Sequence, residues 1–170
     1  MNFNTKKNKK VLIIAPHMDD ETLGMGGTIA RHTQNGHNVY VCIVAHRVYN
    51  HKFDKGENEK ELQNTLNAKE ILGYNDVVFF DLNDERLDVA VQDIVKPLES
   101  FLEKVQPEIV YSNFYGDNHQ DHRAVFGAVR IAVRPTSSFK IKEWYLYETP
   151  SSTDQSPPIL EAAFQPNYYV

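Results

Sequence analysis

The chain has 170 residues, of which 41% are hydrophobic and 24% are charged, and its formal net charge is -5 at pH 7. This length is enough to bury one sizeable core, so we expect a single domain over residues 1–170. Nucleic acids and anionic membranes need a basic protein surface, which an acidic chain does not favour. A small-molecule substrate is therefore the expected partner, and a homo-oligomer is compatible with the sequence.

The chain start and the cysteine content indicate a cytoplasmic protein. Residues 1–10, "MNFNTKKNKK", are basic and are expected to form a disordered tail, because the apolar run after them is too short for a signal sequence. No stretch approaches the roughly 20 apolar residues of a membrane span. Cys42 is the single cysteine, so it cannot form an internal disulfide.

Short apolar runs alternate with helical patterns along the chain. The runs are rich in β-branched and aromatic residues and predict strands at 11–15, 38–44, 77–80, 108–112 and 143–147. Helical patterns lie between them, from about Thr22 to Gly36, up to Gly73, from Val91 to Val105 and over 121–133. Pro97 is expected to kink or restart the third helix.

Strands that alternate with helices predict an α/β fold, a Rossmann-like three-layer sandwich with a mostly parallel sheet in the order 3-2-1-4-5. Such sheets bind ligands beyond the carboxyl ends of their strands, where the strand order reverses. The polar segments "PHMDDE" (16–21) and "NFYGDNHQDHRAV" (113–125) follow the first and fourth strands. Since these strands are predicted neighbours, we expect both segments to meet over one crevice.

Histidines and carboxylates in these segments are suited to a catalytic metal site. His17 can be joined by one carboxylate of the adjacent pair Asp19 and Asp20. Either His119 or His122 would complete a set of three ligands and leave one position open, as in catalytic zinc sites. Bound zinc lowers the pKa of water to about 7, and a neighbouring carboxylate can complete its deprotonation. The segments therefore predict a metal-assisted amide hydrolase.

The two motifs resemble those of the PIG-L (LmbE-like) family of zinc-dependent N-acetylglucosaminide deacetylases, which carries PHxDDE after its first strand and HxDH after its fourth. The chain matches them with "PHMDDE" and "HQDHRAV", in the same order and spacing. The resemblance runs from about Lys10 through "TLGMGGTIAR" and "PEIVYSNFYGDNHQDHRAV" to "YLYE", so it covers most of the chain. It implies hydrolysis of the acetamide of an N-acetylglucosamine-type amino sugar or its conjugate, with release of acetate.

The resemblance also implies a role for each motif residue. His17, Asp20 and His122 would bind Zn²⁺, or Fe²⁺ or another divalent metal. Asp19 would be the general base. His119 would be the cation that stabilises the tetrahedral intermediate.

Other residues are assigned to supporting and substrate-binding roles. Asp121 would fix a metal-binding histidine, and Glu21 would be a buried acceptor behind the ligands. Substrate contacts are assigned to Arg47 and Tyr49, in a polar loop beside the crevice, and to Asp117. A cation in this loop could hold an anionic aglycone, and an aromatic ring could stack on a sugar. The segment "STDQSPP" (152–158) is expected to be a mobile loop without a role.

The chain departs from the family pattern in three places. Met18 stands where proline is common, and little consequence is expected because its side chain is not a ligand. The segment "AHRVYNHKFDKGE" replaces the "TDG"-type turn that is frequent after the second strand, which leaves the aglycone unassigned. The chain ends at "FQPNYYV", where relatives usually continue through a further strand and helix, so we expect either a fragment or a natural truncation.

A dinucleotide-binding loop is an alternative reading of the glycines after the first strand. Gly24 and Gly26 fit the start of a GxGxxG pattern, but the third glycine would have to replace Ile29. The adjacent acids would also repel a pyrophosphate. We expect these glycines, with Gly27, to allow close packing of a helix on the sheet instead.

Two further alternatives concern the metal residues. Two histidines and a carboxylate also form the facial triad of non-haem Fe(II) oxygenases, but those enzymes are antiparallel β barrels, unlike the alternating pattern of this chain. A non-catalytic sugar-binding or partner-binding module derived from the deacetylase fold is the main alternative. Retention of both Asp19 and His119, which a binding module would not need, favours the enzyme.

Overall fold

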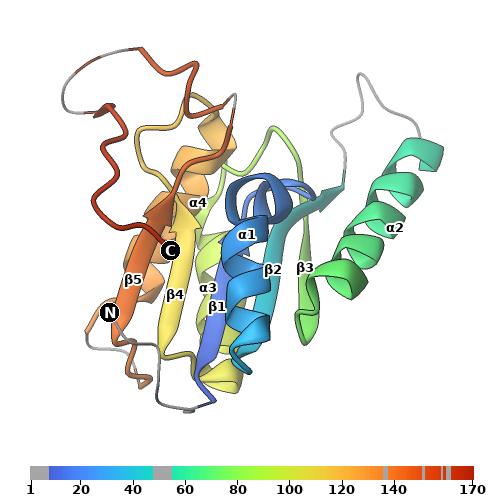
Figure 1. Cartoon of the computed structure of the whole chain (residues 1–170). Coiled ribbons are helices and arrows are strands. Elements are labelled where there is room, and N and C mark those ends of the chain that lie inside the picture. The colour runs from blue at the N-terminus through green and yellow to red at the C-terminus, as the bar shows by residue number, and fades with distance from the viewer. Residues whose placement is uncertain (1–7, 48–54, 136–137, 151, 158, 160–161) are drawn as a thin grey trace.

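The computed structural model describes residues 8–47, 55–135, 138–150, 152–157, 159 and 162–170, and strands alternate with helices along it (Figure 1). The strands are β1 (Lys10–Ala15), β2 (Asn38–Arg47), β3 (Asp76–Asn83), β4 (Ile109–Asn113) and β5 (Glu143–Tyr147). The helices are α1 (Asp20–Gln34), α2 (Lys55–Leu72), α3 (Val91–Val105) and α4 (Gln120–Ala132). Among the described residues, no helix combines the length and apolar composition that a membrane crossing needs.

The five strands are parallel and lie in the order β3-β2-β1-β4-β5, so the predicted α/β fold and strand order are confirmed. Ile13 of β1 has Val41 of β2 on one side and Tyr111 of β4 on the other. The chain adds β2 and β3 on one side of β1 and then β4 and β5 on the other. The loops that follow β1 and β4 therefore begin side by side, at the point where the order reverses.

Apolar side chains cover both faces of the sheet, because successive residues of a strand point to opposite faces. Ile13 lies in one buried cluster with Met25 and Ile29 of α1. Ile14 lies in another, with Leu98 of α3 and residues of α4. Figure 1 shows α1 in front of the sheet and α3 and α4 behind it. This arrangement is the predicted three-layer sandwich.

The ends of the first two helices agree with the sequence prediction. Gly36 lies two residues after the end of α1, and Gly73 directly follows α2. Both glycines have a φ of +74°. Glycine adopts this left-handed conformation without the steric cost of a Cβ, so it ends helices readily.

The third helix does not restart at Pro97, as the sequence had suggested it could. Proline removes one helical N–H, yet α3 continues from Val91 to Val105. The apolar stripe of the helix is buried on both sides of the proline, at Ile94, Val95, Leu98, Leu102 and Val105. Burial of this stripe favours one continuous helix.

The glycines of α1 differ from one another in their surroundings. A Cβ on Gly24 would lie 2.7 Å from the carbonyl oxygen of Glu148 and 2.7 Å from Cδ2 of Tyr147. Gly24 thus lets α1 approach the end of β5, as predicted. No described atom lies within 4 Å of a Cβ added to Gly26 or Gly27, so the prediction of close packing is wrong for these two.

This difference predicts opposite effects of one substitution at two positions of α1. Gly27→Ala should raise the free energy of unfolding by about 0.5–1 kcal/mol, because alanine loses less backbone entropy in a helix. Gly24→Ala should lower it by about 1–3 kcal/mol, because backbone must move to admit the methyl group. Urea unfolding of both variants measures the two values. Equal effects would contradict the close approach at Gly24.

Candidate metal centre

The loop after β1 leads directly into α1 and orients two of the predicted ligands. Asp20 is the first residue of α1, and its Oδ2 accepts the backbone N–H of His17 at 2.9 Å. The carboxylate is thereby turned back toward the end of β1, where it is buried. Asp19 occupies the N-cap position, but its side chain makes no capping hydrogen bond. The carboxylate of Asp20 is therefore directed toward the predicted ligands, whereas that of Asp19 is not held by a capping contact.

The first turn of α4, after the loop that follows β4, supplies the third predicted ligand. Asn113 ends β4, and its side-chain amide donates to the carbonyl of His122 at 2.7 Å. His119 caps α4, because its Nδ1 accepts the backbone N–H of Asp121 at 3.2 Å. His122 lies in the first turn of α4 and is buried.

Three donor atoms, from the loop after β1 and the first turns of α1 and α4, form a nearly equilateral triangle. His17 Nδ1 lies 3.4 Å from Asp20 Oδ2 and 3.2 Å from His122 Nε2, and the last two atoms are 3.3 Å apart. Ligand atoms bound tetrahedrally to zinc at 2.0–2.1 Å lie about 3.3 Å from one another. Two imidazole nitrogens and a carboxylate oxygen are also donors that zinc accepts. The cluster of His17, Asp20 and His122 can therefore hold a metal ion.

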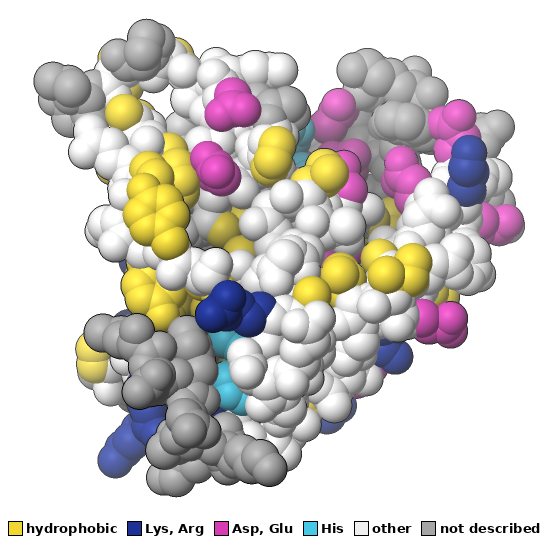
Figure 2. Space-filling model, viewed as in Figure 1, with side chains coloured by type: hydrophobic (Ala, Val, Ile, Leu, Met, Phe, Trp, Pro, Cys, Tyr) yellow, Lys and Arg dark blue, Asp and Glu magenta, His cyan; other side chains and the backbone are white. Residues whose placement is uncertain are grey.

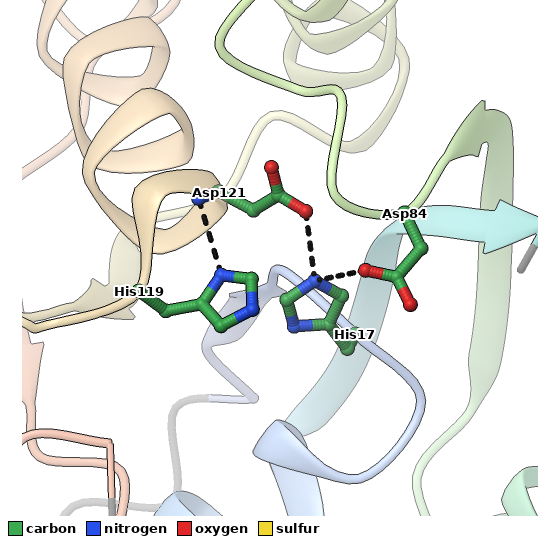
Figure 3. A group of neighbouring side chains, drawn as sticks. All are labelled: His17, Asp84, His119 and Asp121. Carbon is green, nitrogen blue, oxygen red and sulfur yellow. Dashed lines mark hydrogen bonds and ion pairs between the residues drawn. The ribbon is translucent and has the colours of Figure 1, made fainter. Parts of the chain in front are cut away.

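The second ring nitrogen of each histidine contacts carboxylates. His17 Nε2 lies 3.1 Å from Oδ2 of Asp121 and 3.2 Å from Oδ1 of Asp84 (Figure 3). His122 Nδ1 lies 2.9 Å from Oδ2 of Asp117. A carboxylate at one ring nitrogen fixes the tautomer and leaves the lone pair of the other nitrogen for a metal. Both histidines are thus oriented toward the centre of the triangle.

These carboxylates also control the charge of the site. Burial alone would lower the pKa of His122, but hydrogen bonds with Asp117 and Asp20 raise it to about 9. Burial would also lower the pKa of His17. Hydrogen bonds with Asp121 and Asp20 outweigh this effect and raise the pKa well above its usual value. Although burial acts in the other direction, both histidines hold the pKa of Asp20 below its usual range. The site therefore favours positive charge, which a divalent metal supplies in place of protons.

A cleft of about 220 Å³ opens beside His17 and exposes two further predicted residues, Asp19 and His119. Partial desolvation and the neighbouring Asp20 charge raise the pKa of Asp19. Three other acidic residues, Glu61, Asp84 and Glu85, also line this cleft. Figure 2 shows acidic side chains gathered toward the end of the molecule to which the strands point. The cleft thus lies at the acidic, carboxyl end of the sheet.

His119 lines this cleft, and its Nδ1 acts as a hydrogen-bond acceptor. Because Nδ1 accepts the N–H of Asp121, the ring proton is left on Nε2. Burial and the neighbouring charges of His17 and His122 lower the pKa of His119. The cationic role that the family resemblance implies for His119 stays a prediction.

A second group of possible metal donors lies within 4.8 Å of one another, on His17, Asp84, His119 and Asp121 (Figure 3). Its atoms are already engaged. Asp121 accepts two backbone N–H groups, from Glu85 at 2.6 Å and from Leu87 at 3.0 Å. Nδ1 of His119 caps α4. The triangle, whose three donors converge, is therefore the better candidate.

Glu21 does not take part in this geometry. Glu21 is 1% exposed, and its Oε1 accepts the hydroxyl of Thr22. Its Oε2 has no hydrogen-bond partner among the described residues, so the predicted support of a ligand by Glu21 is not observed. Burial raises its pKa to about 7. Tyr49 and the side chain of Arg47 lie outside the described part of the chain.

The carboxylate of Asp117, a predicted substrate contact, is engaged by other residues of the protein. It is 2% exposed, and its carboxylate accepts hydrogen bonds from the hydroxyls of Ser152 and Thr153. Segment 152–158 was expected to have no role, and no sequence pattern links these hydroxyls to a residue 35 positions earlier. The sequence analysis also did not predict Asp84 as a site residue. Asp84 directly follows β3, at the carboxyl ends of the strands, where the crevice was predicted.

Residues 12–133, more than half of the chain, match the PIG-L family model, described as GlcNAc-PI de-N-acetylase. This match contains both loops of the metal centre. The chain belongs to the PIG-L family. It is 32% identical to a PIG-L relative, the uncharacterized deacetylase YaiS of Escherichia coli (strain K12), over 88% of this chain and 78% of that protein.

Two other proteins extend the comparison within PIG-L. A probable N-acetyl-alpha-D-glucosaminyl L-malate deacetylase 2 of Bacillus anthracis is 30% identical over 82% of this chain and 66% of its own length. The structure of N,N'-diacetylchitobiose deacetylase from Pyrococcus horikoshii superposes with a TM-score of 0.67 at 24% identity, over 84% of this chain and 61% of that one. At this identity the structural likeness shows a shared fold alone.

The triangle and the second group of donors predict different effects of two histidine substitutions. His122→Ala should abolish binding of about one metal ion per chain, because a three-ligand site loses a ligand. His119→Ala should retain the metal, because His119 belongs only to the second group. Metal analysis after dialysis against a weak chelator measures both. Loss of the metal in His119→Ala and its retention in His122→Ala would indicate that the metal binds to the second group.

Proposed function

We propose that this chain is a zinc-dependent N-deacetylase that hydrolyses the acetamide of an N-acetylglucosamine-type amino sugar or its conjugate. The observation that carries the proposal is the triangle of His17, Asp20 and His122, which adjoins a cleft containing a carboxylate and an imidazole outside the ligand set. Membership of the PIG-L family supports the same reaction, as do the names of the two deacetylases with known or probable substrates.

The donor set supports a divalent metal at this position. His17, Asp20 and His122 would hold it, and their spacing matches the tetrahedral preference of zinc. When bound, such an ion polarises a carbonyl and makes water more acidic at neutral pH. Fe²⁺ or another divalent metal is the alternative, because affinity alone does not select the metal.

Asp19 would act as the general base and then as the general acid. Its side chain lines the cleft and makes no capping hydrogen bond, so its oxygens are available to a water molecule. It would accept a proton as water attacks the acetamide carbon. It would return that proton to the sugar nitrogen as the C–N bond breaks, which yields a free amine and acetic acid, and the acid then ionises to acetate.

His119 would stabilise the charge that develops on the acetamide oxygen. Its Nδ1 is used as an acceptor by the N–H of Asp121, so the Nε2–H is the group that remains to donate. A fixed hydrogen-bond donor aimed at a developing oxyanion is worth about 2.7–4 kcal/mol in comparable sites. This role requires no positive charge on His119.

A substitution at Asp19 tests the division between binding the metal and moving protons. Asp19→Asn should retain about one metal ion per chain and reduce kcat for acetate release by about 10²- to 10⁴-fold, because an amide cannot accept the proton. Acetate release from N-acetylglucosamine conjugates is measured before and after chelation. Glu61→Gln, which removes another acid of the same cleft, is the matched control and should have a much smaller effect.

The outcomes separate the enzyme from a binding module. Metal-loaded protein that binds these conjugates without releasing acetate would support the non-catalytic alternative. Equal loss of metal in Asp19→Asn and His122→Ala would contradict the separate roles of Asp19 as general base and His122 as metal ligand.

A further inference from the structure

The carboxylate of Asp117 is fully engaged by hydrogen bonds from the protein. Oδ1 accepts the backbone N–H of His119 at 2.9 Å and the hydroxyl of Ser152. Oδ2 faces Nδ1 of His122 at 2.9 Å and accepts the hydroxyl of Thr153 at 3.1 Å. An ionised carboxylate has about four acceptor positions, and all four are used here. Asp117 therefore has no oxygen lone pair left for a substrate or a metal.

We infer that Asp117 is a positioning residue that sets the ring of His122, and that Ser152 and Thr153 aim its carboxylate. The inference rests on the proposed function only in taking His122 as a metal ligand. The backbone of His122 is held separately, because Asn113 donates to its carbonyl at 2.7 Å. What Asp117 adds is the orientation and the tautomer of the imidazole, with the proton on Nδ1 and the lone pair on Nε2.

The two hydroxyls come from the chain after β5 and are themselves oriented. Thr153 Oγ1 accepts the backbone N–H of Thr149 at 2.9 Å, so its proton is free to point to Asp117. The backbone N–H of Asn118 donates to the carbonyl of Ser152 at 3.3 Å, which joins the two segments beside the carboxylate. A segment 35 residues from Asp117 in the sequence thus takes part in setting a metal ligand.

Zinc affinity of purified protein tests this inference without reference to catalysis. Asp117→Ala should weaken Zn²⁺ binding by about 10- to 100-fold, the usual effect of removing a carboxylate behind a metal-binding histidine. Asp117→Asn keeps an acceptor for Nδ1 and should lose less. The double variant S152A/T153A should also weaken binding. Competition with a chromophoric chelator gives the dissociation constants, and the absorption spectrum of Co²⁺-loaded protein reports the ligand geometry.

Ser156→Ala is the matched control. The hydroxyl of Ser156 donates to the carbonyl of Gly116, so it joins the same two segments without touching Asp117. If Ser156→Ala weakens Zn²⁺ binding as much as S152A/T153A, the contact only holds the loop and the inference fails. Wild-type affinity and Co²⁺ spectrum in S152A/T153A and Asp117→Asn would also overturn it, and these variants decide the matter if Asp117→Ala does not fold.

The result is independent of the proposed reaction. Protein that shows the expected losses of affinity but releases no acetate would keep the positioning role of Asp117 and remove the deacetylase function. Acetate release by the wild-type enzyme, with unchanged Zn²⁺ affinity in the variants, would support the deacetylase function and overturn the positioning role of Asp117.

Discussion

The metal centre depends on the adjacency of β1 and β4. His17 follows the first strand and His122 follows the fourth, yet their nearest ring nitrogens lie 3.2 Å apart because these parallel strands pair directly. Two protonated imidazoles this close would repel each other unless carboxylates offset their charges. The structure supplies the carboxylates, at Asp20, Asp117 and Asp121. Everything else at the site is arranged around this pair.

Burying so many ionisable groups costs stability unless each is paired. Removing one partner of a buried pair leaves the other charge uncompensated, which commonly costs 3–5 kcal/mol. Asp121, with no exposed surface, avoids this cost by accepting two backbone N–H groups as well as facing His17. These hydrogen bonds fix the orientation of the ligands, which is the support that a metal site requires.

The sequence was sufficient for the fold and for the convergence of the two loops. Short apolar runs, the glycines that end helices and the alternation of strands with helices are local signals, and they determined the sheet order through general rules of parallel sheets. The family resemblance then assigned His17, Asp20 and His122, which the structure brings within 3.4 Å of one another.

What the sequence did not reveal were contacts whose partners have no characteristic spacing. The hydroxyls of Ser152 and Thr153 resemble those of any polar loop, and only the folded chain brings them to Asp117. The capping contact of His119 was also beyond the sequence, because it depends on how the ring is oriented at the start of α4. Likewise, Gly26 and Gly27 lie beside Gly24 in sequence, but they point away from the close contact between α1 and the end of β5.

The distribution of exposure at the site matches a division between holding a metal and moving protons. Asp20, Asp121 and His122 are at most 3% exposed, so their positions are fixed by packing and hydrogen bonds on every side. Asp19, next to Asp20 in the chain, is exposed in the cleft. A general base has to reach water and a leaving amine, whereas a ligand has to exclude competing partners. The start of α1 separates the two requirements by one residue, because successive side chains at a helix start point in different directions.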